Sequence, residues 1–313
     1  MEISFNSRRS LLALGLLVAV IRPVTSHADP LPVASLTPVI SDLVRNVGGE
    51  HVEVFNVIPP DTDAHAFTPT VSDIRALTEA SVIFVNGLGY ESFLGDLERS
   101  VGDDPVFITV GDAVEPLAVE PSHDHSDHSD HHHHHHGGPD ATVDPHWWHS
   151  VGNARLATNA IRDALIEADP DHADSYRDNA SAYQDRLEKL AREIKLTVAR
   201  LPRDRRVLVT SHDALGYFAR DHGFTIYAVA GLSSDGQPSS KKIRALIEQI
   251  RAEKIPAIFP ENTENPKILD EITRETDATI GGALYADGLG TEKADTYEKM
   301  MRYNAQTIVD ALQ

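Results

Sequence analysis

The 313-residue chain contains no cysteine, which excludes disulfides, thiolate metal sites and a cysteine nucleophile. It also lacks three compact enzyme motifs: the His-Glu-x-x-His pair, the glycine-rich phosphate loop and the Gly-x-Ser-x-Gly nucleophile elbow. After residue 28, no apolar run is long enough to span a bilayer. These absences argue against a protein embedded in the membrane and against the commonest hydrolases and nucleotide-binding enzymes.

Basic residues are scarce relative to acidic ones. The chain has 28 Lys and Arg against 48 Asp and Glu, a formal net charge of −20. Residues 1–28 hold three Arg and one Glu, so the remainder carries 25 basic and 47 acidic residues, a net charge of −22. Such a charge disfavours nucleic acid and anionic membranes as partners. The hydrophobic content of 41% still suffices for real cores, and the length suits two domains.

Residues 1–28 have the features of a secretory signal peptide. A pair of arginines precedes an apolar run over residues 11–21, and Ser26 and Ala28 place small residues where signal peptidase reads them. The arginine pair also resembles a twin-arginine signal, so both export routes stay open. We expect a mature protein that begins near Asp29 and resides in the periplasm.

Short apolar runs alternate with helical patterns, which predicts parallel sheets covered by helices on both faces. Thr68-Pro69 predicts a helix start, with Thr68 as cap and Pro69 in the first turn. The runs that predict strands are residues 33–36, 52–58, 82–85, 106–110, 207–210, 225–229, 256–259 and 279–284.

A long helical pattern follows residue 169, and about 30 residues of helix would extend roughly 45 Å. We therefore predict an α/β protein of two lobes, residues 29–168 and 202–313. Each lobe would have a mainly parallel sheet flanked by helices, and one long rigid linker helix over residues 169–201 would join them. Its apolar face is Tyr176, Ala180, Tyr183, Leu187, Leu190, Ile194, Val198 and Leu201.

Four polar residues stand where a parallel sheet binds ligands, beyond the carboxyl ends of strands: His65, His146, His212 and Asp287. Three imidazoles and one carboxylate suit the tetrahedral preference of zinc. Four protein ligands would leave no position for an activated water, which favours binding over hydrolysis. Each residue could instead be a cap, a turn or a surface residue, because the four are far apart in sequence.

Several longer stretches carry a family resemblance: PPDTDAHAFTPT at 59–70, NGLGYE at 86–91, DPHWW at 144–148, HDALGYF at 212–218 and DGLG at 287–290. In this order they resemble the periplasmic metal-binding proteins of zinc and manganese ABC importers, the cluster 9 (A-I) solute-binding family. The resemblance covers essentially the whole mature chain. It implies a non-enzymatic protein that captures Zn²⁺ with high affinity and delivers it to an inner-membrane ABC permease.

The resemblance also places His65, His146, His212 and Asp287 on the family's four metal positions. Manganese members tend to have Glu at the third position, where this chain has His212, and three imidazoles favour Zn²⁺ over Mn²⁺. We expect one tight zinc site. The alternatives are a manganese-binding importer component and a periplasmic zinc buffer or metallochaperone. A metallohydrolase would return as a candidate if Asp287 were not a ligand.

The chain departs from the family pattern at Trp147-Trp148-His149, where one Trp is usual. His149 could compete as a ligand, but His146 follows Asp-Pro as the family pattern requires, so we expect His149 at the surface or beside the site. Glu261 faces the same cleft and could also touch the metal. Carboxylates that could orient the imidazoles are Asp63, Asp144, Asp213 and Glu261.

Residues 120–143 form a His-rich loop like that of many zinc members, and this composition cannot build a core. Weak zinc binding there either gathers metal for the cleft or has no effect on uptake. A periplasmic zinc metallochaperone is a further candidate partner, and we expect a monomer. Nine of the 17 histidines lie in this loop: His123, His125, His128, His131, His132, His133, His134, His135 and His136.

Overall fold

The computed structural model describes Met1 and residues 29–119, 142–232, 238–263 and 267–313. The rest of the signal peptide and the nine histidines of the His-rich loop lie outside the described residues, so both remain predictions. In the described part of the chain, no helix combines the length and the apolar character needed to cross a bilayer.

A four-stranded parallel sheet with strand order β2-β1-β3-β4 forms the N-terminal lobe. Side chains alternate between its faces. Val33 and Phe84 pack with the helix α1, whereas Ala34 and Ile83 pack with α2 and α3. All four predicted strands are confirmed, within two residues at each end: β1 (Leu31–Ser35), β2 (Val52–Asn56), β3 (Val82–Val85) and β4 (Val106–Thr109). The helices are α1 (Pro38–Gly48), α2 (Val71–Leu77) and α3 (Leu94–Val101).

The predicted helix start at Thr68-Pro69 is wrong, because α2 begins at Val71 with Thr70 as its cap. The Thr70 hydroxyl accepts a hydrogen bond from the Asp73 backbone N–H, and the Asp73 carboxylate accepts one from the Thr70 N–H. This reciprocal pair satisfies two amides at the helix start.

The C-terminal lobe also has parallel strands. The pair β7-β8 continues into the pair β9-β10 through a parallel bridge between Thr210 and Phe259. The last predicted strand is shorter than expected and ends at Ile280. The strands are β7 (Val207–Thr210), β8 (Thr225–Ala228), β9 (Ala257–Ile258) and β10 (Thr279–Ile280). The helices are α6 (Gly216–His222), α7 (Ser240–Glu253), α8 (Lys267–Arg274) and α9 (Tyr297–Leu312).

Besides the helices α3, α6 and α8, three further elements were not predicted from the sequence. The antiparallel pair β5 (Leu117–Val119) and β6 (Thr142–Asp144) lies on either side of the His-rich loop. The helix α4 (Val151–Ala168) begins with Ser150 as its cap and packs along the linker helix. The strands of the pair have only three residues each, too few for a periodic pattern to be recognised.

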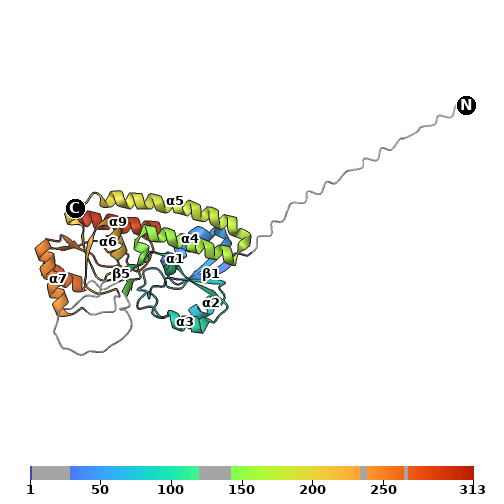
Figure 1. The fold of residues 1–313 in the computed structure, drawn as a ribbon, viewed down its shortest axis with the longest axis horizontal. Helices are drawn as coiled ribbons and strands as arrows, with labels where there is room; N and C mark the ends of the chain where they lie inside the picture. Colours follow the sequence, from blue (N-terminus) through green and yellow to red (C-terminus); the bar gives the residue numbers. More distant parts are fainter. Residues whose placement is uncertain (2–28, 120–141, 233–237, 264–266) are drawn as a thin grey trace, which may run out of the picture.

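The predicted linker helix is present as α5 (Ala173–Val198), preceded by a 3₁₀ turn over Pro170–His172. All eight predicted apolar positions are buried. Figure 1 shows α5 running along both lobes beside α9 and α4. Its buried face belongs to one hydrophobic cluster that extends from Val33 in β1 to Leu312 in α9. The two lobes therefore share a core through α5, and the exact domain boundaries remain predictions.

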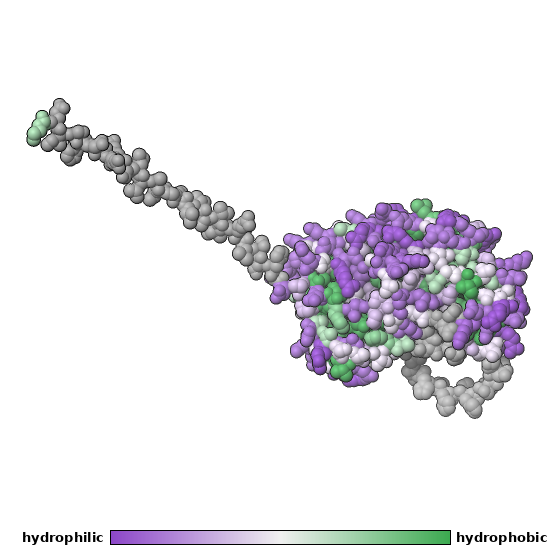
Figure 2. Space-filling model, turned by 180° about the vertical axis from the view of Figure 1, so that it is seen from behind, coloured by the Kyte–Doolittle hydropathy of each residue, from purple (hydrophilic) through white to green (hydrophobic). Residues whose placement is uncertain are grey.

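The surface seen in Figure 2 is largely hydrophilic, with apolar side chains in small separate spots. This agrees with the excess of charged residues. The large apolar side chains that are exposed in the described part of the chain, Met1 aside, are Phe55, Val71, Val106, Leu156, Leu196 and Ile280.

The partly buried Asp42 on α1 contacts the start of α9, and this contact predicts a pH-dependent stability. Burial raises the pKa of Asp42 from 3.8 to about 6, although a hydrogen bond from the Tyr297 backbone N–H opposes the rise. The stability associated with its proton is fully present below pH 3.8 and is lost as the pH rises through 6. Asp42→Asn, which keeps an acceptor for Tyr297, should raise the free energy of unfolding at pH 8 by up to about 3 kcal/mol.

Urea unfolding of wild type and variant at pH 8 and pH 3.5 measures this difference, which should vanish at the lower pH. Asp178→Asn, an exposed carboxylate on α5, is the matched control and should change little at either pH. Equal stabilisation by Asp42→Asn at both pH values would contradict the assignment.

Candidate metal centre

The four residues selected from the sequence come together in the structure. One ligand atom from each of His65, His146, His212 and Asp287 lies within 4.8 Å of the others. His65 follows β2, His146 follows β6, His212 follows β7 and Asp287 follows the bridge at Leu284. The cluster thus forms where the carboxyl ends of strands from both lobes meet. Three of the four residues are buried, and the His65 side chain is 9% exposed.

The distances within the cluster fit a tetrahedral shell of ligands. Asp287 Oδ1 lies 3.2 Å from His212 Nε2, 3.4 Å from His146 Nε2 and 3.6 Å from His65 Nε2. His65 Nε2 and His146 Nε2 are 3.3 Å apart. Bonds of about 2.0–2.2 Å to a central ion would separate tetrahedral ligand atoms by about 3.3–3.6 Å. These four separations are the ones expected between ligands of one small cation.

Asp287 is the charged member of the cluster. Among the described residues, neither of its carboxylate oxygens accepts a hydrogen bond of normal geometry. Burial alone would raise the pKa of this carboxyl, but the facing imidazoles of His146, His212 and His65 hold it well below its usual range. A buried carboxylate without hydrogen-bond donors is costly unless a cation faces it. Asp287 therefore fits a metal ion at the centre of the cluster.

His146 is oriented by a carboxylate two residues before it. Its Nδ1 lies 2.8 Å from Asp144 Oδ1, and its backbone N–H donates to the same oxygen at 2.9 Å. Because a carboxylate accepts, Nδ1 carries the proton and the Nε2 lone pair points at the cluster. Burial lowers the pKa of His146, but its contacts with Asp144 and Asp287 outweigh burial and raise it.

His212 is oriented in the same way from a different strand. Its Nδ1 lies 2.5 Å from Glu261 Oε2, and its backbone N–H donates to Glu261 Oε1 at 3.0 Å. Burial lowers the pKa of His212, but the charge of Glu261 and the contact with Asp287 raise it well above its usual value. Both Glu261 oxygens contact the Nδ1 side of this histidine. Glu261 therefore orients His212 and lies outside the four-residue cluster.

The other two candidate carboxylates, Asp63 and Asp213, make different contacts from those of Asp144 and Glu261. Asp63 Oδ1 accepts a hydrogen bond at 2.9 Å from the backbone N–H of His65, which shapes the loop after β2. Within the described residues, Asp213 makes no hydrogen bond to the cluster imidazoles, and its own backbone N–H donates to the Gly231 carbonyl.

His149 is buried and lies behind the cluster, so the alternative that placed it at the surface is wrong. Its Nε2 lies 2.8 Å from the carbonyl oxygen of Ala286, the residue before Asp287. Burial lowers the pKa of His149 to about 4, so it is neutral at pH 7 and donates this hydrogen bond. His149 is not part of the group of ligand atoms. It supports the loop that carries Asp287.

Two aromatic side chains that the sequence analysis did not select also hold this loop. The Tyr90 hydroxyl donates to the Asp287 carbonyl at 2.8 Å, and its ring lies edge-on to His65 and His146. Trp148 Nε1 donates to the Ala286 carbonyl at 3.1 Å. Tyr90 lies in the motif NGLGYE and Trp148 lies in the motif DPHWW. These motifs were the only indication in the sequence that the two residues belong to the site.

Glu91 holds the turn that presents Tyr90. Its two carboxylate oxygens accept hydrogen bonds from the backbone N–H groups of Asn86 at 2.6 Å and Gly87 at 3.1 Å. Burial raises the pKa of Glu91 to about 7 despite these bonds. The backbone of Gly87 has φ 76°, a conformation that glycine adopts without strain. The turn is thus built from backbone bonds to one buried carboxyl group.

Comparison with known proteins places this chain in a family. The family model described as "Zinc-uptake complex component A periplasmic" (ZnuA) matches residues 33–311. The manganese-binding lipoprotein MntA of Bacillus subtilis is 31% identical over 294 residues, 92% of this chain and 91% of that protein. The iron-binding protein YfeA of Yersinia pestis is 31% identical over 284 residues, 90% of this chain and 86% of that protein.

Solved structures agree with the fold. The periplasmic zinc-binding protein TroA from Treponema pallidum superposes with a TM-score of 0.79 at 29% identity, over 91% of this chain and 99% of that chain. The long helix and the two-lobe α/β arrangement are thus features of a known fold. The chain therefore belongs to the ZnuA family of solute-binding proteins, the non-enzymatic, metal-binding periplasmic components of ABC importers that work with a membrane permease and an ATPase.

Proposed function

We propose that this protein is the periplasmic zinc-binding component of an ABC importer, with His65, His146, His212 and Asp287 as the ligands of one Zn²⁺. The observation that carries the proposal is the buried cluster of three imidazoles and one carboxylate, in which Asp287 Oδ1 lies 3.2–3.6 Å from each imidazole Nε2 and all four ligand atoms lie within 4.8 Å of one another. Neutral imidazoles and one carboxylate leave the bound ion with a charge of +1, which a buried site tolerates better than +2. Zn²⁺ is the cargo, and no catalytic step is needed.

The donor set favours zinc over manganese. Imidazole nitrogen suits Zn²⁺, whereas Mn²⁺ prefers more oxygen ligands in an octahedral arrangement. The relatives are named for different metals: MntA for manganese, YfeA for iron and TroA for zinc. A manganese-binding importer component is therefore the second candidate, and competition between the two ions decides between them.

The rigid arrangement of the two lobes along α5 limits how the bound ion can be released. We propose that the exported mature protein, a monomer, carries the ion to the inner-membrane permease, which must distort the loops around Asp287 to release it. The shared core along α5 limits any opening of the cleft to small movements. In this scheme the His-rich loop collects zinc, or receives it from a metallochaperone, before transfer to the cleft.

One prediction tests the four-residue site in the absence of the His-rich loop. A mature protein lacking residues 123–136 should bind one Zn²⁺ per chain tightly and retain it against an excess of Mn²⁺. His212→Ala in the same protein should weaken zinc binding by more than about 100-fold, because it removes a ligand rather than a residue that merely orients one. Competitive titration against a chromophoric chelator measures both affinities.

His51→Ala, a histidine outside the cluster, is the matched control and should bind zinc as the parent protein does. If deletion of the loop alone abolished tight zinc binding, the four-ligand site would be wrong. A zinc buffer based on the loop would then be the better account. Tighter binding of Mn²⁺ than of Zn²⁺ would make the manganese importer the better account.

The second prediction concerns the carboxylates that orient the imidazoles. Glu261→Gln and Asp144→Asn should each weaken zinc binding by about 10–100-fold, since the amide is neutral and is a poorer acceptor for the imidazole N–H. Glu248→Gln, on the exposed face of α7, is the control and should have no effect. If Glu261→Gln abolished binding as completely as His212→Ala, Glu261 would have to be counted as a ligand itself.

A further inference from the structure

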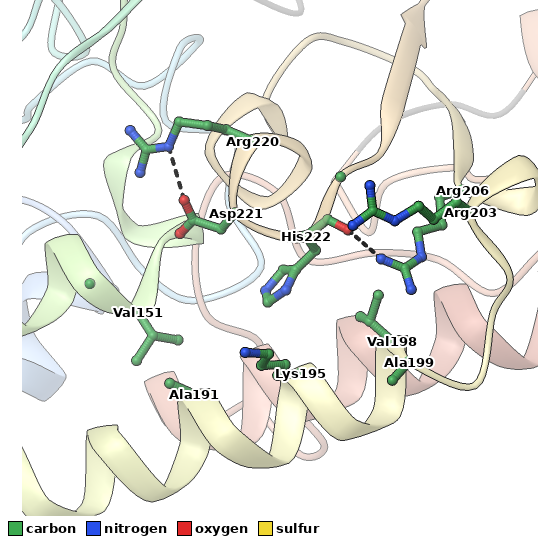
Figure 3. Close-up of a pocket in the computed structure, with 12 residues that line it drawn as sticks. Val151, Ala191, Lys195, Val198, Ala199, Arg203, Arg206, Arg220, Asp221 and His222 are labelled. Carbon is green, nitrogen blue, oxygen red and sulfur yellow. Dashed lines mark hydrogen bonds and ion pairs between the residues drawn. The ribbon is translucent and has the colours of Figure 1, made fainter.

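A groove of about 680 Å³ lies apart from the four-residue cluster, where both lobes meet the linker helix (Figure 3). Its walls come from the start of α4, the last turns of α5, the segment from Arg203 to Arg206 and the end of α6. A volume of this size accommodates a small molecule. The ionisable residues that line it are Lys195, Arg203, Arg206, Arg220, Asp221 and His222.

The charge of this groove is opposite to that of the protein. Asp221 is the one acidic residue among the described residues that line it, and Asp221 pairs with Arg220 at 2.9 Å. Lys195, Arg203 and Arg206 form no ion pair with any described residue. The Arg206 guanidinium instead donates hydrogen bonds to the carbonyls of Leu201 and His222. Three positive charges thus stay uncompensated within one groove.

Arginines outside the groove on α5 and α9 form ion pairs. Arg192 on α5 pairs with Glu188, and Arg302 on α9 pairs with Glu193 of α5. The groove thus gathers unpaired cations although the chain as a whole has a net charge of −20. A groove lined by one sign of charge concentrates ions of the opposite sign.

His222 reports the same positive field. Burial lowers its pKa; the charge of Asp221 opposes this shift, and the charges of Arg206 and Lys195 add to it. In Figure 3 its ring points from α6 toward Lys195 on α5, so that the two side chains face each other across the groove. The His222 ring is therefore neutral at pH 7 and can donate one N–H to a bound group.

The floor of the groove is apolar. Ala191, Val198 and Ala199 of α5 and Val151 of α4 line it between the cations. Guanidinium groups bind carboxylate and phosphate oxygens through paired hydrogen bonds, and an ammonium group adds a point charge. We propose that this groove binds a small organic anion, whose carboxylate or phosphate group contacts Lys195, Arg203 and Arg206 while its carbon chain lies on the apolar floor.

Calorimetric titration of the mature protein with succinate and with glycerol phosphate tests the proposal, and at least one probe should bind saturably in the millimolar range. The double variant Lys195→Ala/Arg203→Ala should raise the dissociation constant by about tenfold or more, since it removes two charged contacts. Lys189→Ala/Arg192→Ala removes the same charge from α5 outside the groove and should bind as wild type does. The probe that binds more tightly identifies the anion as a carboxylate or a phosphate ester.

Two further measurements distinguish anion binding in the groove from metal binding in the four-residue cluster. His212→Ala should bind the anion as wild type does, and the Lys195→Ala/Arg203→Ala variant should retain its zinc affinity, which also shows that it folds. The proposal is overturned if neither probe saturates, or if both double variants bind the probes equally. Loss of anion binding in His212→Ala would also overturn it, because the cleft cation would then be the anion's partner.

Discussion

The buried carboxylate of Asp287 is the constraint on which the rest of the site depends. Burying a negative charge is unfavourable unless positive or polar groups surround it, and here the groups that face it are three imidazoles. Two of them, His65 and His146, come from the N-terminal lobe, and His212 comes from the C-terminal lobe with Asp287. The three imidazoles can hold a cation against this carboxylate only while the two lobes keep their relative position.

That position is held by packing and by hydrogen bonds between the lobes. The apolar face of α5 belongs to a single core shared by both lobes, so that movement of one lobe would expose buried side chains. Tyr90 and Trp148 bind the backbone on either side of the Asp287 peptide, and the Tyr297 hydroxyl donates to the Trp148 carbonyl at 2.8 Å. His149 adds a bond to Ala286. The loop of Asp287 is thus anchored to the opposite lobe by groups that are not in the cluster.

The elements that could be predicted from the sequence are those whose pattern is local. Buried parallel strands are continuous apolar runs, and α5 has one apolar stripe, so both were recognisable. The four cluster residues were recognisable because each follows a strand or lies in a family motif. The roles of Tyr90 and His149 were not, because they depend on carbonyl groups nearly 200 and 140 residues away in the chain. The cap at Thr70 was missed because its competitor, Thr68-Pro69, has an equally good local pattern.

The same rigidity supports the proposed choice of zinc. Asp144 and Glu261 fix the ring positions of His146 and His212, so that their Nε2 atoms cannot turn away without breaking a charged hydrogen bond. A cation that needs six ligands would have to enlarge the shell or recruit Asp287 Oδ2 and water. Enlarging the shell would separate residues that α5 and the interlobe bonds hold at fixed spacing. A four-coordinate ion that accepts nitrogen ligands fits the frame without such movement. The proposed preference for zinc thus rests on the ligand types together with the spacing at which the two lobes hold them.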